Sequence, residues 1–168
     1  MKYIKELEEY MEDKIIIKKN PNGDTRTAKG DITFEDFQKA NDMHINDVNR
    51  IMSKIGDYIK DIGAIHDWTK KEYEKEFFDD FNATRNDGAD FVNLSWYQKH
   101  IREERHHINN YVHEDVDLLD VLEMIADCVG AGLARSGEMR PIEMDKEVLY
   151  KAFENTCKLV KNMCVLEE

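Results

Sequence analysis

The chain has 168 residues, of which 41% are apolar and 36% are charged, and its formal net charge is −12 at pH 7. This length predicts one domain over residues 1–168, with enough apolar surface for a hydrophobic core. The negative charge argues against extended nucleic acid as a partner, because a phosphate backbone needs lysine and arginine stripes. We expect no membrane partner and no secretion signal, since no apolar run approaches the roughly 20 residues that span a bilayer.

The first 32 residues are predicted to form a short helix followed by a small β-hairpin. Residues 3–13 are charged and amphipathic, which is typical of a surface helix. Three isoleucines at 15–17 then precede the turn sequence NPNGD at 20–24. Thr25–Thr27 would be the return strand of the hairpin.

The next part of the chain has helical periodicity. Thr33, followed three residues later by an aspartate, marks a helix start, and the apolar periodicity continues to about Tyr58. A further helical stretch is expected to be interrupted by Gly56 and Gly63. Helical composition then continues through Phe81.

The remaining residues predict a polar loop and three helices. The loop covers 82–94, and a serine and glutamine at its end form a capping-box pattern. We predict an all-α domain of five to seven helices with the small N-terminal hairpin. The three later helices run from Ser95 to about Tyr111, from a cap at Asp115 or Asp117 to about Arg135, and over 145–163.

Five of the six histidines fall between His44 and His107, and their directions can be compared at about 100° per helical residue. His44 is predicted to face the core, where an unpaired imidazole would be costly. Its direction lies within about 40° of those of Phe37, Ala40, Val48, Ile51 and Ile55.

Two later helices also direct potential ligands inward. Glu104 and His107 lie within about 40° of the direction of His100 on the helix that starts at Ser95. His106 is about 100° away from its neighbour and would join them only if the helix were distorted there. Asp127 is one position from the apolar stripe of the following helix.

The adjacent pair His66-Asp67 indicates what these ligands could bind. A carboxylate can bridge two cations while the histidine beside it reaches one of them. A mixture of nitrogen and oxygen ligands suits divalent iron, manganese or zinc. The sequence therefore predicts one or two bound transition-metal ions.

The order of these residues resembles the HD superfamily of metal-dependent phosphohydrolases, whose signature is H…HD…D. The resemblance covers about residues 34–135, and it implies an HD-like helical bundle. The additional histidines resemble members with two or more metals, including the HD-GYP cyclic-dinucleotide phosphodiesterases and the di-iron HD oxygenases. The GYP extension is absent here. The segments HDWTK and WYQKHIREERHH also look like a group of small HD-like proteins of bacteria and phages.

The resemblance implies a ligand set for each of two metals. The bridging carboxylate would be that of Asp67. The first metal would be held by His44, His66, Asp67 and Asp127, and the second by Asp67, His100, His107 and His106.

Three further residues are candidates for catalysis or substrate binding. Lys70 follows Asp67 by three residues, where many HD proteins place a lysine near the substrate phosphate; otherwise it is a solvated lysine. Arg135 either contacts phosphate or stabilises a helix C-terminus. Glu104 is either an acid/base group beside the metals or a surface carboxylate.

The expected function is hydrolysis of a nucleotide or another small phosphate ester, with a metal-activated water as nucleophile. Two alternatives remain: a di-iron oxygenase, and a protein that binds a nucleotide without turnover. The three cysteines, Cys128, Cys157 and Cys164, lack CxxC spacing and indicate reduced thiols. A cytoplasmic location follows, which for a phage protein is the host cytoplasm. The sequence leaves an oligomer open.

Overall fold

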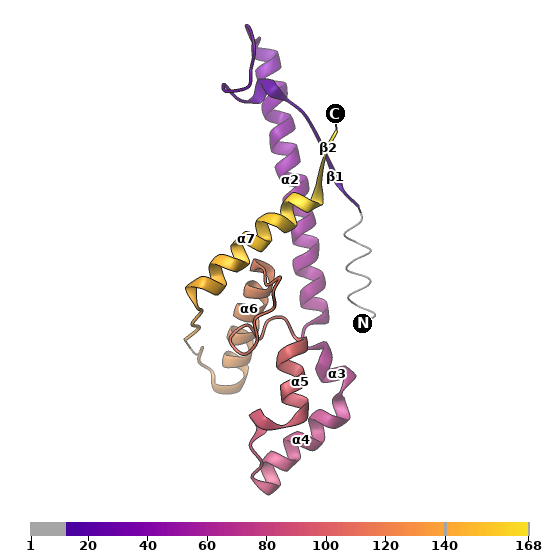
Figure 1. The fold of residues 1–168 in the computed structure, drawn as a ribbon, viewed down its shortest axis with the longest axis vertical. Coiled ribbons are helices and arrows are strands. Elements are labelled where there is room, and N and C mark those ends of the chain that lie inside the picture. Colours follow the sequence, from indigo (N-terminus) through magenta and orange to yellow (C-terminus); the bar gives the residue numbers. More distant parts are fainter. Residues whose placement is uncertain (1–12, 140, 168) are drawn as a thin grey trace. The chain divides into compact units, whose positions relative to one another are not determined.

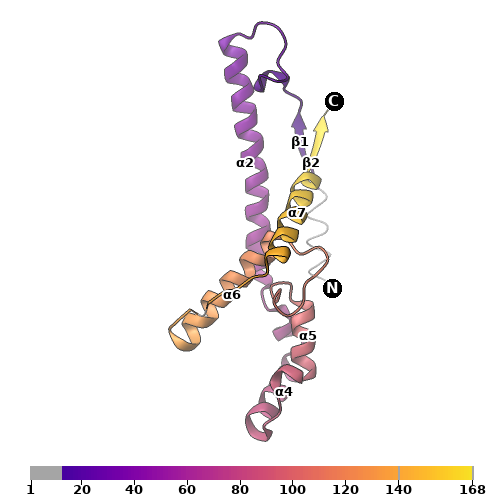
Figure 2. The ribbon, with the colours of Figure 1, turned by 60° about the vertical axis from the view of Figure 1, so that its left-hand side comes forward.

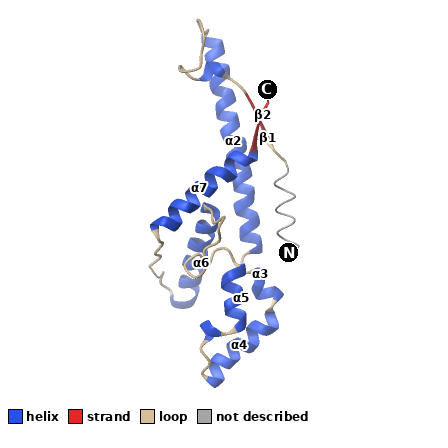
Figure 3. Cartoon of the chain, viewed as in Figure 1, coloured by secondary structure: helices blue, strands red, loops and turns tan. Residues whose placement is uncertain are grey.

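The computed structural model describes residues 13–139 and 141–167. Helices dominate the described residues (Figure 3), so the prediction of a mostly helical chain is confirmed. The helix expected over residues 3–13 lies outside the described residues except for its last position. Among the described helices, none is both long enough and apolar enough to cross a membrane.

The chain divides into two compact units. One consists of Met1–Lys60 with Cys157–Glu168, and the other of Asp61–Thr156. The second unit contains every residue of the candidate site described below. The single domain over residues 1–168 stays a prediction.

The small sheet belongs to the first unit and is not a hairpin. Strand β1 (Ile15–Lys18) pairs in parallel with β2 (Cys164–Glu167), with Ile15 opposite Cys164 (Figure 2). The predicted return strand over residues 25–27 is therefore wrong. Asp24 turns the chain instead: its carbonyl accepts the Thr27 N–H at 3.0 Å, and its side chain accepts a nearby backbone N–H. The N–H groups of Arg26, Thr27 and Ala28 all donate to Asp24, so they do not pair with β1.

Helix α2 (Phe34–Ile65) starts at a reciprocal cap. The Thr33 hydroxyl accepts the Asp36 N–H at 3.1 Å and donates to the Asp36 carboxylate at 2.6 Å. The helix then continues without the break predicted at Gly56 and Gly63. An isolated glycine costs a helix only about 1 kcal/mol, and neither glycine has the positive φ that would end it.

Three helices open the second unit (Figure 1). They are α3 (Trp68–Glu72), α4 (Glu74–Asp87) and α5 (Ser95–Glu103), and the short 3-10 helix η2 (Phe91–Asn93) precedes α5. The loop predicted from residue 82 begins later, because α4 continues to residue 87 and ends at Gly88, whose φ is 72°.

Helix α5 is held against α4 by stacked aromatic rings. The Phe77 ring of α4 lies 3.9 Å from the Trp96 ring of α5, with an interplanar angle of 22°. The other side of Trp96 stacks on the imidazole of His100 at 4.6 Å. The packing of α4 on α5 therefore also fixes the plane of one candidate ligand.

Helix α5 ends at Glu103, eight residues before the end predicted for it. Glu104 is extended, with φ −87° and ψ 115°, and a turn follows in which the His107 N–H donates to the Glu104 carbonyl at 3.2 Å. This change of direction is the distortion that His106 needed in order to face the same way as His107. We call residues 104–107 the histidine turn.

Helices α6 (Leu118–Ser136) and α7 (Lys146–Met163) follow their predicted ranges closely. Asp117 caps α6, and Asp120 completes the reciprocal capping box. Between these helices and the chain after the histidine turn lies an apolar core, formed by Ile108, Val116, Val121, Met124 and Ala152. The core fixes α6 next to the histidine turn.

Candidate metal centre

The His66-Asp67 pair lies in the turn between α2 and α3 rather than within a helix. Asp67 has φ 59° and ψ 30°, and it is the one non-glycine residue with positive φ in the described part of the chain. This left-handed conformation costs about 1–2 kcal/mol for a residue with a Cβ. Such strain persists where the surroundings fix it, which is common at functional sites.

Imidazole Nε2 atoms converge on the carboxylate of Asp67. His66 Nε2 lies 3.3 Å from Asp67 Oδ2. His100 Nε2 and His106 Nε2 lie 3.5 and 3.8 Å from Asp67 Oδ1. These three histidines come from the end of α2, from α5 and from the histidine turn, so elements far apart in the sequence meet at one carboxylate.

The Nδ1 atoms of the same three histidines face protein acceptors. His66 Nδ1 lies 2.9 Å from Glu123 Oε1, and His106 Nδ1 lies 3.2 Å from the same oxygen. His100 Nδ1 lies 2.6 Å from the Thr69 hydroxyl. The hydrogen bonds to His66 and His100 favour a proton on Nδ1 and so leave Nε2 as the nitrogen that can bind a metal, whereas His106 Nδ1 has no hydrogen-bond partner among the described residues.

The acceptor of His100 is itself fixed by a buried carboxylate. Glu104, 4% exposed, accepts the Thr69 N–H at 2.8 Å and the Thr69 hydroxyl at 2.6 Å. Because that hydroxyl has given its proton to Glu104, its oxygen accepts from His100 Nδ1. Burial raises the pKa of Glu104, although the two Thr69 hydrogen bonds oppose that shift. Glu104 Oε1 is thus bound to Thr69, the residue that also contacts His100.

Within the described residues, two groups of three potential ligands have their ligating atoms within 4.8 Å of one another. Asp67 belongs to both groups. The first group is His66, Asp67 and His106, and the second is Asp67, His100 and His107.

Two further predicted ligands are His107, which belongs to the second group, and Asp127, which lies beside the first group. His107 Nε2 is 2.8 Å from His100 Nε2. Asp127 Oδ1, on α6, is 3.5 Å from His66 Nε2 and so lies beside the first group. Two ligand atoms on one tetrahedral ion with bonds of about 2.1 Å are about 3.4 Å apart, so most of these spacings suit a shared ion.

The site also contains buried polar atoms without a hydrogen-bond partner among the described residues. They include Asp67 Oδ1 and His106 Nε2, which face each other at 3.8 Å. Buried polar atoms without a hydrogen-bond partner are costly. A divalent cation between them would satisfy both, so the residues fit a metal.

The electrostatics of the metal-free site follow from burial and from its few cations. Asp67 and, next, Glu123 raise the pKa of His66 to about 10. Burial and then neighbouring imidazoles lower the pKa of His100 to about 3 and that of His107 to about 4. At neutral pH the last two rings are therefore neutral, which is the state that binds metals.

Lys70 supplies further positive charge. Its ammonium pairs with Asp67 Oδ2, three residues earlier in the chain. Burial alone would raise the pKa of Asp67, but His66 and Lys70 outweigh burial and hold it well below its usual range. Asp67 is therefore ionised, and two protein cations balance its charge when no metal is bound.

The histidine turn is attached to α6 by Arg105. Its Nε and Nη2 atoms donate to the two carboxylate oxygens of Asp120, both at 2.8 Å, and Nη1 donates to Asp115 at 3.0 Å. Asp120 is 3% exposed and also caps the start of α6. This bidentate pair fixes the histidines of the turn relative to the acidic residues of α6.

Sequence reasoning missed Thr69, Arg105 and Asp120 as parts of the site. The first two carry no spacing signal, because their partners are remote in the chain. Glu123 is different: the sequence already makes it a candidate, and it precedes Asp127 by four residues and so shares its helix face.

Two predicted site residues are not brought together with the others. His44 is exposed on α2, so the expectation that it faces the core is wrong, and it belongs to neither ligand group. Arg135 is exposed near the end of α6, about 12 Å along the helix from Asp127.

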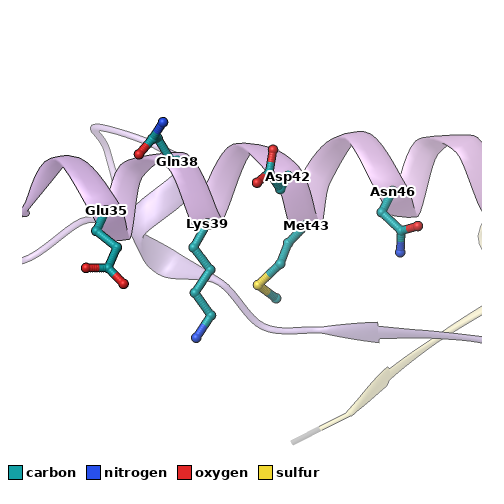
Figure 4. A pocket seen from close by; sticks show the side chains of 6 residues that line it. All are labelled: Glu35, Gln38, Lys39, Asp42, Met43 and Asn46. Atoms are coloured by element: carbon teal, nitrogen blue, oxygen red, sulfur yellow. The ribbon is translucent and has the colours of Figure 1, made fainter.

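A hollow of about 440 Å³ lies elsewhere, along the first turns of α2 (Figure 4). Its walls are side chains of that single helix, and most of them are exposed. It offers no buried polar group to orient a ligand, unlike the centre around Asp67. The side chains that line it are Glu35, Gln38, Lys39, Asp42, Met43 and Asn46.

Comparison with known proteins gives a family. A model of DUF5662, described as a family of unknown function, matches residues 33–165. The chain therefore belongs to this family. No curated protein and no solved structure matches the chain.

The attachment of the histidine turn can be tested through stability. We expect Arg105→Ala to lower the free energy of unfolding by about 3 kcal/mol or more, because it leaves Asp120 buried and unpaired. Asp115 is the other acidic partner of Arg105, and the Asp115 side chain is 77% exposed. Asp115→Ala should therefore lower the free energy of unfolding by less than about 1 kcal/mol. Urea denaturation of the metal-free proteins measures both. Equal losses would contradict the anchoring by Asp120.

Proposed function

We propose that this member of the DUF5662 family is a metal-dependent phosphohydrolase with a two-ion centre. The observation that carries the proposal is the convergence of three Nε2 atoms on Asp67, each ring having its Nδ1 atom against a protein acceptor. Histidines that merely fill a core need no such common direction. Nitrogen and oxygen ligands in this ratio suit iron, manganese or zinc.

The two ligand groups assign the ions to residues. His66, Asp67 and His106 would hold one ion, with Asp127 beside them, and Asp67, His100 and His107 would hold the other. This assignment differs from the one implied by the HD resemblance, because His106 replaces His44 at the first ion. Bound divalent ions would supply Lewis acidity, which makes water a better nucleophile and offsets phosphate charge.

The chain's own residues would position the substrate. Lys70 is half-buried beside Asp67, and its ammonium is close enough to contact a phosphate oxygen at the ions. Glu123 and Thr69 would keep the imidazole rings in their ligating tautomer throughout. The order His66-Asp67…Asp127 shared with HD phosphohydrolases supports a phosphate ester, and a nucleotide or another small ester is the substrate class we propose.

The two-ion assignment predicts distinct metal counts for three variants. Wild-type protein reconstituted with manganese or iron should hold about two ions per chain, and His107→Ala about one. Asp67→Asn should hold none, because it removes the shared carboxylate; asparagine tolerates the left-handed conformation, so the fold should persist. Elemental analysis gives the counts, and circular dichroism verifies folding.

His44→Ala is the matched control for these counts. It removes an exposed imidazole outside both ligand groups, so the wild-type count should remain. A folded Asp67→Asn variant with the full wild-type metal content would rule out the shared carboxylate.

The hydrolase proposal predicts a specific role for Lys70. The loaded enzyme should cleave nitrophenyl phosphate mono- or diesters, or members of a nucleotide panel. Lys70→Gln should lower kcat/KM about 10- to 100-fold, the value of one hydrogen bond to a charged group. Lys71→Gln removes the exposed neighbouring lysine and should leave kcat/KM unchanged. A fully loaded protein that turns over none of these esters would refute the hydrolase.

A further inference from the structure

Helix α2 carries an exposed apolar stripe in the first unit. At about 100° per residue, its members point within about 40° of one direction. Ile45 is 64% exposed, Met52 59% and Phe34 74%. The stripe consists of the exposed residues Phe34, Phe37, Ile45, Val48, Met52 and Ile59 and the half-buried Ile55. An exposed apolar surface of this length marks an interaction site.

The stripe is separate from the edge of α2 that packs within its own unit. That edge is marked by Ala40 and Tyr58, which are 2% and 4% exposed. Arg50 extends from the same side of the helix and donates to the Ile16 carbonyl at 2.9 Å. The directions of Ala40 and Tyr58 lie about 100° from the centre of the stripe. Within the described residues of the first unit, the contacts of α2 with strand β1 therefore leave the stripe uncovered.

Charged residues avoid the stripe. Between residues 34 and 60, no aspartate, glutamate, lysine or arginine points within about 80° of its centre. The charged side chains share the opposite half of the helix, for example Lys39, Asp57 and Lys60. Two identical copies of the stripe can therefore meet without placing like charges against each other.

The spacing of the stripe suits another helix. From Ile45 onward its members are separated alternately by three and four residues, which is the heptad pattern of helices that pack at a shallow angle. The stripe extends about 38 Å along α2 from Phe34 to Ile59. Side chains over such a length can bury the roughly 800 Å² per partner of a stable interface. Asn41 is the polar exception in the stripe.

We propose that the apolar stripe of α2 binds the same stripe of a second copy, so that the protein is a homodimer. A partner with a charged binding surface would require complementary charges, and the stripe has none. A stripe that carries no charge and is apolar except at Asn41 is complementary to itself. This dimer is independent of the metal centre, whose residues all lie in the second unit.

The full-length protein tests the dimer directly. Sedimentation or light scattering over a hundredfold range around about 10 μM should give twice the chain mass of 19.8 kDa. Met52→Glu should shift the protein to the monomer mass, because it places a charge in the centre of both stripes. Met52 is already exposed, so the monomer should stay folded, which circular dichroism verifies.

Ser53→Glu is the matched control. It adds the same charge at the next residue, about 100° around the helix and on the charged half, and should leave the dimer intact. A wild-type protein that is monomeric at every concentration would overturn the proposal. Another segment of the chain or a different protein would then cover the stripe. A folded Met52→Glu variant that remains dimeric would overturn the proposal as well.

Discussion

The carboxylate of Asp67 is ionised and largely buried, and one of its two oxygens has no donor among the described residues. The other oxygen is balanced by Lys70 and His66. A buried carboxylate oxygen that lacks a donor carries a desolvation cost even where cations balance the charge of the group. The imidazole atoms nearest the unpaired oxygen, His100 Nε2 and His106 Nε2, lie 3.5 and 3.8 Å from it and form no hydrogen bond with it. A cation supplied from solution resolves this conflict, and the rest of the site is arranged around that requirement.

Contacts from neighbouring residues hold the imidazole rings of His66, His100 and His106 in place. Glu123 contacts the far side of two rings, Thr69 binds the third, and Trp96 stacks against that third ring. Arg105 ties the histidine turn to the start of α6. The left-handed turn at Asp67 adds a backbone cost that these contacts sustain. Rings fixed in advance lose little freedom when an ion binds, which favours tight binding.

Sequence reasoning predicted helix types and ranges where periodicity was strong. The last two helices match because the caps at Asp117 and Asp145 and the breaks after residue 135 are local signals. The hairpin failed because the partner of β1 is nearly 150 residues away, which local patterning cannot reveal. The predicted end of α5 was wrong for a related reason. The contacts that terminate the helix, from Glu104 to Thr69 and from Arg105 to Asp120, are tertiary.

The site shows the same limits. The sequence indicated which histidines and acids could ligate, since residue type and order carry that information. It could not separate His44 from the rest, because an apolar helix face predicts burial whether it is covered by the same chain or by another one. Thr69 and Arg105 were not predicted as parts of the site, because their partners are far away in the sequence and no spacing pattern links them. Side-chain direction across a tertiary contact is decided by packing, which a single sequence does not show.

Anomalous diffraction from crystals of protein loaded with manganese or iron, recorded on both sides of the metal absorption edge, tests the centre most directly. The account predicts two peaks about 3.5–4 Å apart. One should lie among His66, Asp67 and His106, and the other among Asp67, His100 and His107. Metal bound elsewhere, or crystals of fully reconstituted protein with no peak at Asp67, would contradict the account.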